Sequence, residues 1–144
     1  MNKFIPNIGN KQFKKFKKEK DKHVNKKAYK MTTLNFGDFG LKAYSSGFLN
    51  YKQIEACRRA IVRKLKRKGK LWINCYPYKP LTSKGSGVRM GKGKGNISDW
   101  IYPVYVGDVL FELSNVNIYD ATRALKSGST KLQIKLKIIY KKFY

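Results

Sequence analysis

The charge imbalance of this chain constrains its fold more than any other feature. Its 144 residues contain 33 Lys and Arg but only 8 Asp and Glu, which gives a formal net charge of +25 at pH 7. Charges of one sign repel one another in a compact state, so such a chain is normally compensated by a polyanion. Nucleic acid is the commonest polyanion in this role, and a membrane surface is the alternative. The charge therefore predicts a surface that binds phosphates.

The composition supports one folded domain and argues against a membrane partner. The hydrophobic fraction of 42% and the aromatic fraction of 14% are sufficient for a core in a chain of this length. No apolar run approaches the roughly 20 residues that a transmembrane helix needs. Nor does the sequence contain a strongly apolar helix with a basic face, which is typical of proteins that lie on a membrane surface.

Residues for catalysis or metal binding are scarce. His23 is the only histidine, and Cys57 and Cys75 are not closely spaced. We interpret the two cysteines as small buried side chains in a reducing compartment. A zinc site would have too few ligands, and no two carboxylates form an acid–base pair. We therefore expect no enzyme activity, no metal and no cofactor.

The N-terminal segment, residues 1–30, is predicted to be a basic arm separate from a single domain over 31–144. It carries eleven lysines and two acids with little apolar periodicity, so the free arm is expected to be disordered. Its candidate contacts with a nucleic-acid backbone are Lys14, Lys15, Lys17 and Lys18. A solvated tail without function is the alternative.

The clearest helix is expected over residues 50–68. Asn50 is a good N-cap, Gln53 completes a capping box, and Gly69 is the expected residue after the helix. Ile54, Cys57, Ile61 and Leu65 form one apolar stripe. The opposite face carries Lys52, Arg59, Arg63, Lys66 and Arg67. Because neighbours of one sign repel each other on a helix, this face favours phosphate binding over simple solvation.

The remaining elements predict an α+β fold, with a single mostly antiparallel sheet and two helices packed on it. A hairpin or bent strand pair is expected over 31–48 with its turn at residues 37–40, and a further strand over 70–76. Strands 100–106 and 109–113 flank a Gly107-Asp108 turn, and Pro103 implies an edge or a bulge.

Two more elements complete the prediction. A helix is expected over 118–127, capped by Asn117 and ended by Gly128. Residues 131–140 alternate between apolar side chains and a basic face that includes Lys135 and Lys137.

A long loop over residues 77–97 contains five glycines. Arg89, Lys92 and Lys94 alternate with glycines, and loops of this length are usually functional or disordered. A nucleotide-binding fingerprint is excluded, because no G-x-x-x-x-G-K-[ST] occurs and Asn96 stands where G-x-G-x-x-G needs glycine. We expect contact with a nucleic-acid backbone, with an inert flexible loop as the alternative. The segment Tyr76-Pro77-Tyr78-Lys79-Pro80 is either a site where an unpaired base or sugar stacks or a rigid turn.

Several motifs in the same order give the chain a family resemblance. The chain resembles the large-subunit ribosomal protein L-sixteen family, in its bacterial and organellar form. The stretches that carry the resemblance are residues 36–43, 53–60, 69–73, 79–82, 88–96, 109–112 and 131–135. The resemblance covers roughly residues 31–139. Tyr78 departs from the usual Asp before Lys-Pro, and Gln133 from the usual Pro. The contacts of the longer, Lys-rich arm cannot be carried over.

The resemblance implies a structural constituent of the large ribosomal subunit. Its partners would be large-subunit rRNA, A-site tRNA, neighbouring ribosomal proteins and 5S rRNA if present, with no self-oligomer. The loop near the A-site tRNA and the peptidyl transferase region would comprise Tyr78, Lys79, Lys84, Arg89, Met90, Gly91, Lys92, Gly93, Lys94 and Gly95. The alternative is an extra-ribosomal basic RNA- or DNA-binding module.

The same comparison suggests where the chain works. The helix motif around Cys57 and the Ser127-Gly128-Ser129 stretch look more like mitochondrial than plastid members of the family. We therefore expect a mitochondrial ribosome, with plastid or bacterial cytoplasm as the alternatives.

Overall fold

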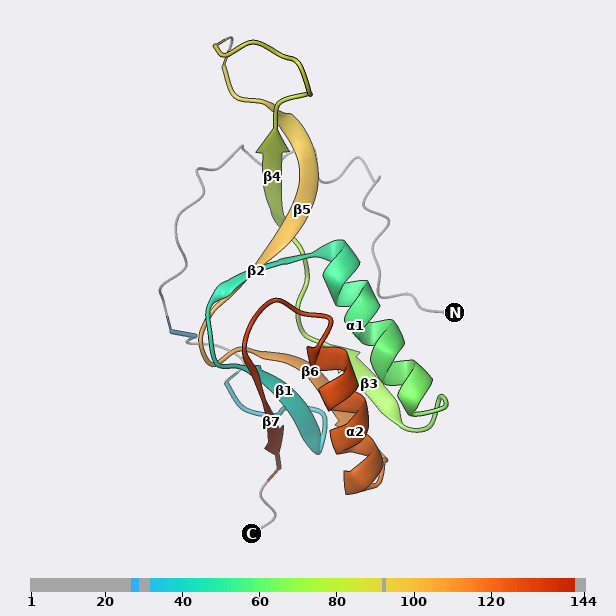
Figure 1. Ribbon diagram of the computed structural model, residues 1–144. Coiled ribbons are helices and arrows are strands. Elements are labelled where there is room, and N and C mark those ends of the chain that lie inside the picture. Colours follow the sequence, from blue (N-terminus) through green and yellow to red (C-terminus); the bar gives the residue numbers. More distant parts are fainter. Residues whose placement is uncertain (1–26, 29–31, 92, 142–144) are drawn as a thin grey trace.

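The computed structural model describes residues 27–28, 32–91 and 93–141 (Figure 1). Almost all of the predicted basic arm lies outside these residues, including Lys14, Lys15, Lys17 and Lys18, so its contacts stay predictions. Two of its residues are described. Lys27 forms an isolated parallel bridge with Val106, and the Ala28 N–H donates to the Val106 carbonyl at 2.9 Å.

The described chain is an α+β fold, as predicted, in which every strand pair is antiparallel. A four-stranded sheet has the order β3-β6-β1-β7. Its strands are β1 (Phe39–Ala43), β3 (Lys70–Ile73), β6 (Val109–Ser114) and β7 (Leu136–Tyr140). A three-stranded sheet has the order β2-β5-β4. Its strands are β2 (Gly47–Asn50), β4 (Lys79–Ser83) and β5 (Asn96–Val104).

The prediction of one sheet was wrong, because several strands that follow each other along the chain, such as β1 and β2 or β5 and β6, join different sheets. β5 and β6 do not form the predicted hairpin at Gly107-Asp108. This turn binds β1 instead: the Gly107 N–H donates to the Ala43 carbonyl, and the Ala43 N–H donates to the Asp108 carbonyl, both at 2.8 Å. The Asp108 carboxylate accepts from the Tyr105 N–H at 2.9 Å and holds the turn.

The predicted turn at residues 37–40 was also wrong. Phe39 and Gly40 belong to β1, which pairs with β6 on one side and β7 on the other. The preceding residues do not form a strand; they supply backbone N–H groups to the carboxylate of Glu112 in β6. A tertiary hydrogen-bond partner thus replaces the local hairpin.

Helix α1 (Tyr51–Lys64) starts where the sequence predicted, and the Asn50 N–H donates to Gln53 Oε1 at 3.0 Å. The predicted apolar stripe is buried. The helix ends one turn earlier than residue 68, since Lys66 and Arg67 adopt positive φ angles of 50° and 65°. Few residues other than glycine take this conformation, so the tight turn into β3 is locally strained.

Helix α2 (Ile118–Ser129) begins after Asn117, whose side chain accepts from the Tyr119 N–H at 3.4 Å. It runs past its predicted end, so Gly128 lies inside the helix. The two helices pack against each other, and α2 also contacts β1 and β7 (Figure 1). The core lies between this helix pair and the four-stranded sheet and includes Leu41, Phe111 and Leu125.

The predicted loop over 77–97 was too long. Residues 79–83 and 96–97 are paired within the hairpin of β4 and β5, which leaves residues 84–95 as the loop. Pro80 is tolerated because β4 is an edge strand. Pro103 lies where β5 pairs with β2 but no longer with β4, in agreement with the predicted edge position.

Two further strands are shorter than predicted. β3 ends at Ile73, and β7 begins at Leu136 although the alternating pattern starts at residue 131. Leu132 is nevertheless buried in the core, whereas Lys135 and Lys137 are exposed as expected. The alternation therefore predicted the orientation of the side chains better than the hydrogen bonding of the backbone.

Candidate nucleic-acid interface

The outer face of α1 concentrates positive charge, as the helical periodicity predicted. Lys52, Arg59 and Arg63 are exposed on the helix, and Lys66 and Arg67 are exposed in the turn that follows it. A shallow hollow at the C-terminal half of the helix is lined by Arg58, Arg59, Val62, Arg63, Lys66 and Arg67. A second hollow, towards the N-terminal half, is lined by Tyr51, Lys52, Glu55, Ala56, Arg59, Ala60, Arg63 and Lys131. We call these two hollows the α1 surface; the cations that line them suit anionic groups.

Two residues of the α1 surface were missed from the sequence. Arg58 lies next to the apolar stripe on the helix, and Lys131 comes from the segment between α2 and β7. The sequence could have indicated Arg58, because Glu55 and Arg58 are spaced at i and i+3 and can form an ion pair on a helix. The alternation over residues 131–140 puts Lys131 on the basic face of that segment, but only the tertiary fold brings it beside α1.

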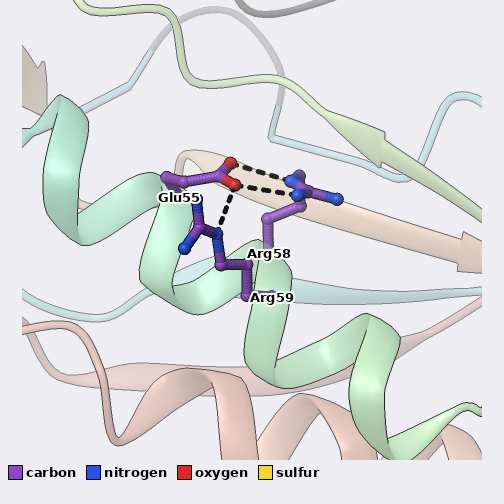
Figure 2. Close-up of polar contacts among 3 residues, drawn as sticks. All are labelled: Glu55, Arg58 and Arg59. Atoms are coloured by element: carbon purple, nitrogen blue, oxygen red, sulfur yellow. Dashed lines mark hydrogen bonds and ion pairs between the residues drawn. The ribbon is translucent and has the colours of Figure 1, made fainter. Parts of the chain in front are cut away.

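Glu55 orders two of the arginines (Figure 2). Arg58 donates from Nε to Oε2 and from Nη2 to Oε1, both at 2.8 Å, and Arg59 donates from Nε to Oε1 at 2.7 Å. The side chain of Arg58 is 19% exposed and that of Arg59 is 72% exposed. One carboxylate thus holds a half-buried guanidinium in a fork and orients an exposed one.

The electrostatics of this cluster follow from the same contacts. The hydrogen bond from Arg58 is the main reason that the pKa of the Glu55 carboxyl lies below its ordinary value, and partial burial acts in the opposite direction. The hydrogen bond to Glu55 in turn raises the pKa of Arg58. Both groups therefore remain charged at neutral pH, and the cluster keeps a net charge of about +1 for phosphate binding.

The loop over residues 84–95 lies at the tip of the hairpin of β4 and β5, projecting away from the helices and the four-stranded sheet (Figure 1). Arg89 and Lys94 are exposed, and Met90 is 95% exposed. Lys84 Nζ donates to the Gly91 carbonyl at 2.6 Å, which bridges the loop. Lys92 lies outside the described residues.

The glycines of this loop have two different roles. Gly91 and Gly93 have φ angles of 97° and 80°, and nothing lies within 4 Å of a Cβ placed there. They permit the turn and leave the backbone open to another surface. At Gly95, by contrast, a Cβ would clash with the backbone of Ser83, so the close approach of the two strands requires glycine.

The structure separates Lys79 from the other predicted loop residues. Lys79 lies in β4, is only 8% exposed and has its Nζ 5.5 Å from the centroid of the Phe48 ring. Tyr78 is 43% exposed and packs edge-to-face against Tyr102 at 6.2 Å. The predicted contacts therefore fall on three separate regions: the α1 surface, the hairpin tip and the exposed lysines Lys135 and Lys137 beside and within β7.

Glu112 is a charged residue that sequence reasoning left without a role. It is fully buried, and its Oε2 accepts from the N–H groups of Asn35, Phe36 and Gly37 at 3.1, 2.8 and 2.8 Å. Its Oε1 accepts from Asn74 Nδ2 at 2.7 Å. The sequence does contain a signal for this buried role, because Glu112 is an acid inside the apolar stretch 109–113. Its bonds are all internal, so its role is structural.

The described ranges offer no candidate metal site, membrane-spanning helix or exposed cysteine. No three His, Cys, Asp or Glu side chains gather in these ranges to hold a metal ion. Neither of the two helices described is long and apolar enough to span a membrane. Cys57 and Cys75 are both buried as free thiols.

Comparisons with known proteins identify the family. Residues 10–139 match the family described as Ribosomal protein L16p/L10e. "Large ribosomal subunit protein uL16" of Kosmotoga olearia is 49% identical over 125 residues, covering 87% of this chain and 89% of the relative. The protein of the same name from Petrotoga mobilis is 45% identical with the same coverage, and that from Buchnera aphidicola is 47% identical over 110 residues, or 76% and 81%. The chain therefore belongs to the ribosomal protein L16p/L10e family, as a bacterial-type uL16 and a structural component, not an enzyme.

Proposed function

We propose that this constituent of the large ribosomal subunit binds large-subunit rRNA through its α1 surface. The observation that carries the proposal is the gathering of six cations along α1 and the turn that follows it, Lys52, Arg58, Arg59, Arg63, Lys66 and Arg67, joined by Lys131. Cations at this density neutralise phosphates and release their counterions, which makes binding strongly dependent on salt. The two shallow hollows add a shape into which an RNA backbone fits.

The hairpin tip is the second part of the proposal. We infer that Arg89, Lys92 and Lys94 reach the A-site tRNA beside the peptidyl transferase region. The projection of the loop and its open glycine backbone support this, because both allow close approach to a phosphate chain. Contacts with neighbouring ribosomal proteins, and with 5S rRNA where it is present, rest on the family resemblance.

The test of the α1 surface compares two pairs of substitutions that remove equal charge. Arg63→Ala with Arg67→Ala removes two exposed cations from the α1 surface, and Arg123→Ala with Lys126→Ala removes two exposed cations from α2. The affinity of the full chain for large-subunit rRNA is measured across a salt series. Each lost phosphate contact should reduce the log–log salt slope by about one.

We expect the α1 pair to lower the slope by about two and the α2 pair to leave it nearly unchanged. Equal losses from both pairs would instead indicate general attraction of a basic protein to a polyanion. In that case the extra-ribosomal RNA- or DNA-binding module would be the better account.

The test of the hairpin tip uses Arg89→Ala together with Lys92→Ala. The variant should enter the large subunit in normal amounts but weaken the accommodation of A-site tRNA. Normal tRNA binding by subunits that carry the variant would contradict this part of the proposal and leave rRNA binding by α1 intact.

We also propose that the ribosome concerned is mitochondrial, from the motif around Cys57 and the Ser127-Gly128-Ser129 stretch. The relatives named above are bacterial, which also fits the bacterial alternative. Tagged protein would be sedimented from a mitochondrial lysate with and without RNase. One copy per large subunit, lost on RNase treatment, supports the proposal, and absence from mitochondrial particles contradicts it.

A further inference from the structure

Three residues at the edge of the four-stranded sheet form an exposed aromatic stack with a cation beside it. The Phe36 ring is 61% exposed and lies 6.1 Å from the Trp72 ring, with 19° between the planes. Lys70 Nζ lies 4.9 Å from the centroid of the Trp72 ring and is exposed. We call Phe36, Trp72 and Lys70 the aromatic platform. It lies on β3 and the segment before β1.

The Phe36 ring is held in place by the backbone that carries it. The Phe36 N–H and both neighbouring N–H groups donate to the buried Glu112 carboxylate. Gly37 packs so closely that a Cβ would lie 2.7 Å from the Leu113 carbonyl oxygen and 2.9 Å from Glu112 Cβ. An exposed ring on a fixed backbone loses little conformational freedom when a partner binds.

Positive charge lies at the platform itself, since the exposed Lys70 places its Nζ 4.9 Å from the centroid of the Trp72 ring. Lys66, Arg67 and Lys68, also exposed, shortly precede it in the chain, in the turn from α1 into β3. A flat π face beside a run of cations matches an unpaired nucleotide, which stacks its base on the ring and places its phosphate near the cations.

We propose that the aromatic platform binds an unpaired base of RNA by stacking on Phe36, with Lys70 at the adjoining phosphate. This inference rests on the proposed rRNA binding and adds a stacking contact that recognises single-stranded RNA to the phosphate contacts of the α1 surface. The base lies parallel to the Phe36 ring, on the side away from Trp72.

The test uses the full chain and an RNA octamer of uridines with one central 2-aminopurine, whose fluorescence falls when the base stacks. Affinity is measured in parallel by the anisotropy of an end-labelled octamer. Phe36→Tyr keeps a ring, and Phe36→Leu keeps an apolar side chain without one. Tyr119→Leu is the control, because Tyr119 on α2 is 81% exposed but lies outside the platform.

The native chain, Phe36→Tyr and Tyr119→Leu should all quench 2-aminopurine. Phe36→Leu should lose the quenching and bind the octamer about tenfold more weakly, as expected for a lost stacking contact. Quenching and affinity that are unchanged in Phe36→Leu would overturn the proposal, and would favour an apolar contact with a neighbouring protein.

The two proposals fail in different ways. If the octamer is never quenched while rRNA binding still depends on Arg63 and Arg67, the platform proposal is wrong and the proposed function stands. If rRNA binding also shows no dependence on α1, both proposals fail.

Discussion

The side-chain amide of Asn74 donates a 2.7 Å hydrogen bond to the carboxylate of Glu112, 38 residues further along the chain. The other carboxylate oxygen accepts from the backbone N–H groups of Asn35, Phe36 and Gly37. One buried charge therefore ties the segment after β3 and the segment before β1 to the central strand β6. These bonds satisfy the charge and so offset the cost of its burial.

Glu112→Gln should destabilise the fold, because an amide replaces an acceptor that is surrounded by donors. Hydrogen bonds to a charged group contribute about 1.5–3 kcal/mol, so we expect the free energy of unfolding to fall by about this amount. Urea denaturation measures the change. Adding Asn74→Asp supplies an acceptor for the new amide and should recover part of the loss. No recovery would mean that the Asn74 contact contributes little.

Gly128→Ala tests the packing of α2 on α1. A Cβ at this position would lie 2.6 Å from Ile61 Cγ1, 2.9 Å from Ile61 Cδ1 and 3.1 Å from Cys57 Sγ. Alanine gains up to about 1 kcal/mol of helix propensity over glycine, whereas overpacking costs about 1–3 kcal/mol. We expect a net loss of stability in thermal melts. Ile61→Ala makes room for the methyl group, so the double variant should be more stable than the sum of the single changes predicts.

Glu55→Gln tests whether Glu55 affects RNA binding by orienting Arg58 and Arg59 or only through its negative charge. The change raises the formal charge by one, so simple attraction predicts tighter binding to rRNA. If Glu55 acts by orienting Arg58 and Arg59, specific binding should instead weaken by a few-fold. Asp120→Asn on α2 is the matched control, since it removes an exposed acid with no cation bound to it among the described residues. Tighter binding by both variants would exclude an orienting role.

The same ion pairs predict a pH dependence of stability. Because the folded pKa of Glu55 lies below its unfolded value, its stabilisation is fully present above about pH 4.5 and is lost as the pH falls through the folded pKa. The difference in unfolding free energy between the native chain and Glu55→Gln should therefore shrink below about pH 4.5. A difference that stays constant down to pH 2 would contradict the role of the ionised carboxylate.

The cysteines should be unreactive while the chain is folded. Cys57 is 0% exposed and Cys75 is 3% exposed, and burial raises the pKa of Cys57 to about 12 and raises that of Cys75 as well. At pH 8 neither thiol forms the nucleophilic thiolate to a useful extent. Alkylation by iodoacetamide should be slow in buffer and fast in urea. Rapid modification of Cys57 in the folded protein would show that the helix pair opens readily.

Short-range patterns in the sequence predicted the elements that depend on neighbouring residues. Asn50 and Gln53 are three residues apart, and their cap forms as expected. The stripe of Ile54, Cys57 and Ile61 is buried because helical periodicity alone puts these side chains on one face. The motifs were also specific enough to identify the ribosomal family, which the comparisons confirm.

Only the tertiary structure decided which elements meet. Alternation marks a strand but does not say which strand it pairs with, so β5 and β6 fall into separate sheets although a tight turn joins them. Tertiary contacts also bury Lys79 and place Lys131 beside α1. They bring four hydrogen-bond donors to the buried Glu112 carboxylate. Each outcome depends on contacts between residues far apart in the sequence, and these form only when the whole core packs.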